Sequence, residues 1–419
     1  MLTGFGCGSA PGGFHPRELT ETAGGSAAPI GTIERFSSMR ITLRRSTAAL
    51  LAGALVLAAC GEAPDEETED TTDEVEETEE PEEEPEEEAT DEDAEEAEED
   101  EAAAPEGDYR GCLVTDQGGV DDQSFNETAW AGMQRAESEL GVEISVLESN
   151  SESDFEPNIQ AFVDQDCDLI VTVGFLLGEA TQEAADANPD QLFAIVDEGI
   201  EGDNLLGLTF ATEQAGFLAG YVAAAMTETD IIGTYGGLNI PPVTVFMDGY
   251  LAGASYYNDE FGTSVVVEGW DGEDGLFTGN FESQDDGRNI TDTLLQAGAD
   301  IIMPVAGPVG LGTATAIEDF GQGTMIWVDT DGFESTQFGE LMLTSVMKNM
   351  DVAVFDAMAA VVDDSFEGGI YVGTLENDGV GLAPFHDFED EVPDEVKDAL
   401  PELREGIIAG DISVDPADY

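Results

Sequence analysis

The sequence predicts an α/β protein with two doubly wound parallel-sheet lobes. Short apolar runs alternate with amphipathic helical segments, and strand–helix alternation of this kind produces parallel sheets covered on both faces. The alternation occurs in two successive sets, each of roughly 100 to 120 residues, which is a usual domain size. Each set is expected to form one sheet with its helices, and each sheet forms one lobe.

The elements of each set share one signature, a short apolar strand followed by a segment with helical periodicity. In the first set, strands are expected at 111–115, 143–147, 168–174, 192–197 and 205–210, with helices near 124–140, 155–165, 178–187 and 213–226. In the second set, strands are expected at 230–237, 264–268, 300–306 and 325–329, with helices near 243–261, 287–297 and 312–319.

The remaining C-terminal residues are expected to divide between the lobes. The stretch "GELMLTSVMKNMDVAVFDAMAAVV" at 339–362 is interpreted as one long apolar helix, followed by the strand "GIYVGTL" and a last helix near 393–409. We therefore assign 109–229 and about 341–365 to lobe one. Lobe two comprises 230–340 and about 366–419.

The N-terminal region has the pattern of an exported lipoprotein. From Met39, three arginines precede an apolar stretch that ends in "LAAC", which is typical of a secretory signal over 39–59. Small residues before Cys60 resemble the bacterial lipobox, so Cys60 is the expected lipidation site and anchor to the extracytoplasmic face of the cell membrane. Residues 1–38 precede a complete signal and are interpreted as a mis-called leader.

Charge separates a tether from the folded part. Residues 60–108 carry 29 Asp and Glu and no Lys or Arg, a composition that predicts a disordered acidic spacer. Residues 109–419 carry six Lys and Arg against 62 Asp and Glu, a net charge of −56. This charge argues against nucleic acid as a partner and suggests a halophilic host, where salt screens the repulsion.

Few residues of the folded part can bind metal or form covalent bonds. Cys112 and Cys167 are its two cysteines and begin two strands that should be parallel neighbours, so a disulfide between them is expected. His386 is its one histidine, which makes a zinc site improbable. No metal, other cofactor or catalytic residue is expected.

The stretch "DQGGVDDQSFN" at 116–126 lies between the first strand and the first helix. Ser124 and Glu127 have capping-box spacing, and acids just before a helix N-terminus are favoured by the helix dipole. The spacing of the acids does not fit a calcium loop. Asp116 follows the strand directly and should line a cleft, because ligands bind beyond the carboxyl ends of parallel strands. Phe125 either starts the core stripe of the helix or faces that cleft.

Several stretches together resemble the BMP family of ABC-transporter substrate-binding lipoproteins, the PnrA type of purine-nucleoside receptor. They are "LVTDQGGVDDQSFNETAWAGMQ", "DLIVTVGF", "QAGFLAGYVAA", "GADIIMPVAGPVGLGTATAI", "LTSVMKNMDVAVFDA" and "GVGLAPFHDF", in the family's order. The resemblance implies the two-lobed periplasmic-binding-protein type I architecture with three hinge crossings.

The resemblance also implies a ligand site. Phe125 and Phe281 would sandwich a purine base, with Asn126 beside it. Asp329 and Lys348 would hold the ribose hydroxyls, and Gly307 would bring backbone close to the sugar. The family's Gln after the Asp329 strand is replaced here by Gly332.

The residues alone support part of this assignment. A buried, unpaired Lys is costly, so Lys348 needs a partner, and Asp329 is the expected one. A purely structural salt bridge, and a core role for Phe281, remain alternatives. Phe246 and Tyr250 lie inside a helical stretch and are interpreted as core.

The implied function is capture of a purine nucleoside by a monomer that delivers it to ABC permease subunits. The alternatives are a binding protein or sensor for a sugar or other small solute, and a nucleoside hydrolase. The hydrolase is disfavoured because the cleft residues include no nucleophile–base pair.

Overall fold

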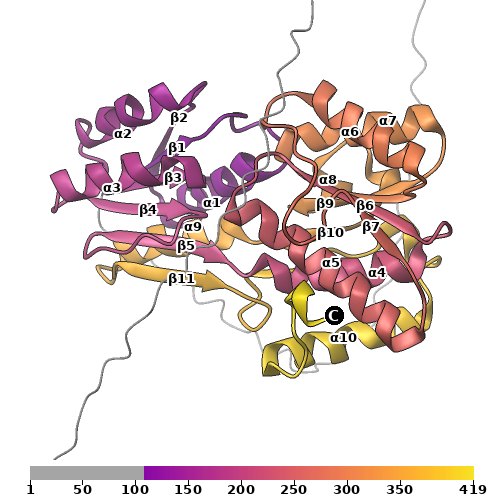
Figure 1. Ribbon diagram of the computed structural model, residues 1–419. Coiled ribbons are helices and arrows are strands. Elements are labelled where there is room, and N and C mark those ends of the chain that lie inside the picture. Colours follow the sequence, from indigo (N-terminus) through magenta and orange to yellow (C-terminus); the bar gives the residue numbers. More distant parts are fainter. Residues whose placement is uncertain (1–107) are drawn as a thin grey trace, which may run out of the picture. The chain divides into compact units, whose positions relative to one another are not determined.

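A computed structural model describes residues 108–419. The expected leader, signal peptide, lipidation site at Cys60 and acidic tether lie outside the described residues, apart from Asp108. Residues 108–419 form two six-stranded sheets with helices (Figure 1). None of the helices in this part is both long and apolar enough to cross a membrane.

We define lobe one by the first sheet and the helices that cover it. Its strands, in spatial order, are β11 (Gly369–Gly373), β5 (Leu205–Phe210), β4 (Leu192–Val196), β3 (Leu169–Val173), β1 (Arg110–Thr115) and β2 (Glu143–Leu147), all parallel. Its helices are α1 (Phe125–Leu140), α2 (Phe155–Val163), α3 (Gly178–Ala187) and α9 (Met350–Val362).

Successive side chains of a strand point to opposite faces of the sheet. The contacts of neighbouring residues in β1 therefore show which helices cover each face. On β1, Cys112 and Val114 join the apolar cluster with the residues of α2 and α3, whereas Leu113 joins the cluster with α1 and α9. All three side chains are fully buried. Both faces are therefore covered, as the apolar composition of the strands predicts.

Lobe two repeats this plan. Its strands, in spatial order, are β12 (Val380–Leu382), β10 (Met342–Lys348), β9 (Thr324–Asp329), β8 (Ile301–Val305), β6 (Ile231–Gly236) and β7 (Val266–Glu268). Only β12 is antiparallel to its neighbour among these strands. Its helices are α4 (Thr212–Met226), α5 (Pro241–Phe261), α6 (Gln284–Ala297), α7 (Leu311–Phe320), α8 (Gly332–Ser335) and α10 (Asp394–Ala409).

The two sheets have the same strand order. When strands are counted within each lobe, both read second, first, third, fourth, fifth and then the returning C-terminal strand. The fourth strand is β4 in lobe one and β9 in lobe two. Each of them ends at an aspartate, Asp197 directly after β4 and Asp329 as the last residue of β9.

The chain passes between the lobes three times, as the fold class requires. The crossings lie between β5 and α4, between β10 and α9, and between β11 and β12. They differ from the expected boundaries at 229, 340 and 365. The expected long helix at 339–362 is wrong in its first half, because Met342–Lys348 forms β10 and the helix begins only at Met350.

Helices α4 and α5 approach each other closely enough to exclude side chains. A Cβ atom at Gly220 would collide with the carbonyl of Tyr250, and one at Gly253 would collide with the carbonyl of Phe217. This contact fixes α5, which carries Phe246 toward the interlobe pocket, against the helix that follows the first crossing.

A disulfide joins Cys112 in β1 to Cys167, two residues before β3, with the Cα atoms 6.2 Å apart. Because β1 and β3 are parallel neighbours, both cysteines lie toward the amino ends of their strands. The bond is therefore at the opposite end of the sheet from the residues that follow the strands.

Candidate ligand-binding site

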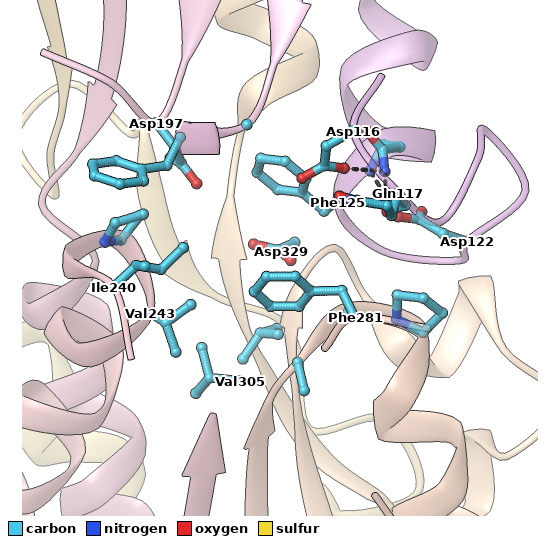
Figure 2. Close-up of a pocket in the computed structure, with 18 of the residues that line it drawn as sticks. Asp116, Gln117, Asp122, Phe125, Asp197, Ile240, Val243, Phe281, Val305 and Asp329 are labelled. Carbon is cyan, nitrogen blue, oxygen red and sulfur yellow. Dashed lines mark hydrogen bonds between the residues drawn. The ribbon is translucent and has the colours of Figure 1, made fainter. Parts of the chain in front are cut away.

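One pocket lies between the lobes, at the carboxyl ends of the strands (Figure 2). This is where open parallel sheets bind ligands. The structure brings together around this pocket all seven residues that the sequence indicated. They are Asp116, Phe125, Asn126, Phe281, Gly307, Asp329 and Lys348.

Asp116 and Asn126 form a buried pair on the lobe-one side. Asn126 Nδ2 donates to Asp116 Oδ1 at 2.9 Å, and both side chains are at most 7 % exposed. Asn126 Oδ1 accepts no hydrogen bond from any residue within 108–419. Because a buried acceptor left unpaired is costly, this oxygen is available to a donor on a ligand.

Burial controls the charge of Asp116. It raises the pKa of the Asp116 carboxyl to about 8, while the hydrogen bond from Asn126 and the Lys348 ammonium act in the opposite direction. The carboxylates of Asp122 and Asp197 raise this pKa further. Near neutral pH, Asp116 is therefore largely protonated and can donate a hydrogen bond.

The N-terminus of α1 is capped differently from the expected capping box. Ser124 makes no side-chain cap; instead, the Asp122 carboxylate accepts the backbone N–H groups of Ser124, Asn126 and Glu127 at 2.9–3.0 Å. Burial raises the pKa of Asp122 to about 6, although these three donors oppose the shift. Glu127 accepts from the backbone N–H of Gln123. The Ser124 hydroxyl is thereby released for another contact.

Lys348 provides the only side-chain cation among the residues that line the pocket. It is the last residue of β10 and is 2 % exposed. Its Nζ lies 2.5 Å from Asp197 Oδ2 and 3.7 Å from Asp329 Oδ1. The expected partner Asp329 is therefore the more distant one, and the closer carboxylate belongs to lobe one.

Asp197 was missed as a ligand candidate by sequence reasoning, although it directly follows β4, at the end of the sheet where ligands bind. Burial raises its pKa, and the Lys348 ammonium opposes this shift. Asp197 and Asp329 have φ angles of 67° and 73°, a left-handed conformation that few residues other than Gly, Asn and Asp adopt readily. This shared backbone geometry turns both carboxylates toward one ammonium.

Aromatic rings from both lobes enclose the same space. Phe125 and Phe281 extend into the pocket from opposite lobes (Figure 2), and Lys348 Nζ lies 4.7 Å from the Phe125 ring centroid. The Phe281 ring lies against Gly237, where no Cβ could fit. Phe246, interpreted from sequence as core, is buried in the core and also lines the pocket.

Two other residues singled out in the sequence, Tyr250 and Gly332, supply no side chain to the pocket. Tyr250 is fully buried in the core of lobe two and does not line the pocket. Gly332 packs against Trp327, and its backbone N–H donates to Ser345 Oγ at 3.0 Å. A side chain at 332 would collide with the indole, so this position contributes no group to the pocket.

Metal binding has no structural support in the part of the chain that the structure describes. Residues 108–419 contain no group of three or more His, Cys, Asp and Glu side chains that could hold a metal ion. Of the acids of 116–126, Asp122 caps α1, and Asp116 and Asp122 line the pocket.

The two-lobed fold with a buried polar pocket between sheets is that of a solute-binding protein. Residues 111–416 match the family Bmp, described as "ABC transporter substrate-binding protein PnrA-like". The chain belongs to this family of ABC-transporter substrate-binding proteins.

Relatives and a solved structure agree with this assignment. An uncharacterized lipoprotein of Pyrococcus abyssi is 34% identical over 318 residues, covering 71% of this chain and 77% of the relative. The ABC transporter nucleoside-binding protein BmpA of Lactococcus lactis subsp. cremoris is 32% identical over 327 residues, covering 73% and 89%.

A crystal structure of an ABC transporter solute-binding protein from Aeropyrum pernix K1 superposes with a TM-score of 0.66 at 27% identity. The match covers 73% of this chain and 92% of that chain. The periplasmic-binding-protein type I architecture expected from the sequence is thus confirmed.

Proposed function

We propose that this protein captures a purine nucleoside between its lobes. The observation that carries the proposal is the arrangement of one pocket. Two phenylalanines enter it from opposite lobes, and a buried ammonium lies between two carboxylates in its wall. A flat base fits between aromatic rings. Vicinal ribose hydroxyls both donate and accept, which suits carboxylates beside an ammonium.

The polar pair of lobe one supplies groups for the base edge. Asn126 Oδ1 is an acceptor without a protein partner in the described part, and protonated Asp116 is a donor. A purine edge carries both ring-nitrogen acceptors and N–H donors, so it can satisfy both groups. The name of the Lactococcus relative, a nucleoside-binding protein, points to the same ligand class.

Calorimetric titration with nucleosides, free bases and ribose tests the proposal. Inosine or another purine nucleoside should bind, and hypoxanthine and ribose should each bind far more weakly, because each satisfies half of the pocket. Tight binding of ribose or another sugar with no response to nucleosides would overturn it. Chromatography of the inosine mixture should show no released base.

We further propose that a lipid at Cys60 anchors the protein outside the membrane, where it delivers ligand to permease subunits. The support is the lipobox-like sequence before Cys60 and the lipoprotein name of the Pyrococcus relative. Replacing Cys60 by Ala should move the protein from the membrane fraction to the soluble fraction. Nucleoside uptake by the host should then fall.

A further inference from the structure

The turn before α1 reaches across the cleft and contacts lobe two. The carbonyl oxygen of Gln123 accepts from Trp327 Nε1 at 3.2 Å and from Ser335 Oγ at 3.3 Å. The hydroxyl of the next residue, Ser124, donates to Asp329 Oδ2 at 2.9 Å. The Ser124 hydroxyl also lies 3.3 Å from the carbonyl oxygen of Val328. Two consecutive residues of lobe one therefore make four hydrogen-bond contacts to lobe two.

The local backbone is arranged for these contacts. Gln123 has a φ angle of 58°, a left-handed conformation that costs free energy in a residue with a Cβ. The conformation is held by Glu127, which accepts the Gln123 N–H. Because Asp122 caps the helix, the Ser124 hydroxyl is not needed there. The Gln123 carbonyl and the Ser124 hydroxyl are therefore not used to cap α1, and both face lobe two.

We propose that Gln123 and Ser124 form a closure latch, which holds the lobes together in a fraction of molecules even without ligand. Trp327 and Ser335 do not line the ligand pocket, so their hydrogen bonds to Gln123 favour the closed state whether or not the pocket is occupied. A protein already partly closed binds more tightly and releases more slowly, because less of the closing free energy must come from the ligand.

The Asp329 side chain belongs both to the latch and to the ligand site. Asp329 Oδ2 accepts from Ser124, and Asp329 Oδ1 faces Lys348. Ser124 is therefore a positioning residue, which orients a pocket carboxylate only when the lobes are closed.

The sharpest variant is Ser335→Ala, which removes one latch donor from a half-buried position and leaves Trp327 as a probe. Losing one neutral hydrogen bond should lower the closed-to-open ratio roughly 5-fold. In the ligand-free protein, NMR should then show faster hydrogen exchange at the Trp327 indole N–H than in the wild type, by up to roughly 5-fold where the closed state predominates. If inosine binds, its dissociation rate constant from Ser335→Ala should exceed that from the wild type by a similar factor.

Matched controls lie in the same chain. The Trp270 indole donates to Asp248 Oδ1 at 2.8 Å within lobe two, so its exchange rate should not change. Ser138→Ala removes an exposed hydroxyl that bonds only within α1 and should leave both rates unchanged. Trp327→Phe removes the second latch donor and should accelerate inosine release further.

The latch is refuted if Ser335→Ala changes neither the Trp327 exchange rate nor the inosine dissociation rate. A Trp327 indole that exchanges in the wild type as fast as a free indole also refutes it. If Trp327→Phe does not fold, Ser335→Ala decides alone. If inosine does not bind at all, the nucleoside proposal fails, and indole exchange still decides the latch.

Discussion

Replacing Lys348 by Met should destabilise the ligand-free protein strongly. Met keeps the length of the side chain and removes its charge. The ammonium is 2 % exposed, and its nearest carboxylate, on Asp197, is 9 % exposed. Breaking a buried pair by removing one partner costs about 3–5 kcal/mol, because the other charge stays buried and unpaired. At about 2–4 °C per kcal/mol, the melting temperature should fall by about 6–20 °C.

The assay is thermal unfolding followed by circular dichroism at fixed salt and pH. Lys397→Met is the matched control, because Lys397 pairs with Glu389 and Asp394 near the surface. Exposed pairs contribute about 0–1 kcal/mol, so this control should shift the melting temperature by only a few degrees. Equal small shifts for both variants would refute the role of the buried ammonium.

A double variant tests whether Lys348 and Asp197 stabilise the fold as a pair. Asparagine tolerates the left-handed backbone conformation at position 197. The Asp197→Asn change removes the carboxylate that Lys348→Met would leave unpaired. Asp197→Asn with Lys348→Met should therefore lose less stability than the sum of the single changes. Additive losses would show that the two side chains do not act as a pair.

Four further predictions concern other groups. Phe125→Ala or Phe281→Ala should weaken inosine binding about 5- to 150-fold in calorimetry, whereas an unchanged affinity with collapsed stability would indicate a core role. The folded state raises the pKa of Asp116 to about 8, so its protonation stabilises the fold at low pH and this contribution is lost as pH rises from about 4 to about 8. Asp116→Asn should flatten the corresponding fall in melting temperature, and an unchanged slope would contradict the assignment. Reducing the Cys112–Cys167 bond should cost roughly 4 kcal/mol in denaturant unfolding, and an unchanged midpoint would show that the bond adds no stability. The melting temperature should rise as KCl shortens the screening length from ~10 Å at 0.1 M to ~3 Å at 1 M, and a flat response would remove the support for a halophilic host.

The sequence predicted the strands and helices of both sheets well, because each short apolar run is bounded by polar turns. It failed at 339–362, where β10 and α9 are both predominantly apolar and periodicity does not distinguish a buried strand from a buried helix. The strand ends at Lys348, and the helix begins at Met350, directly after Asn349. The boundary expected at 340 is displaced for the same reason, because β10 belongs to the sheet of lobe two.

The site was predicted as a set of residues, but its contacts were not. The seven expected residues share one pocket, because most of them lie where a strand ends or a helix begins at the same edge of a sheet. The pairing of Lys348 with Asp197 could not be predicted, since it depends on how far the lobes close. The Ser124–Glu127 spacing indicated a capping box, yet Asp122 competes for the same N–H groups and is the cap in the structure.

The identical strand order of the two sheets gives the ligand site an internal equivalence. Asp197 and Asp329 stand at the same place in the two halves, with the same unusual backbone angle. The two carboxylates are therefore topologically equivalent, one in each lobe, and one ammonium, that of Lys348, lies near both. A substitution at one of these aspartates can thus be compared with the same substitution at its equivalent in the other lobe, within one molecule.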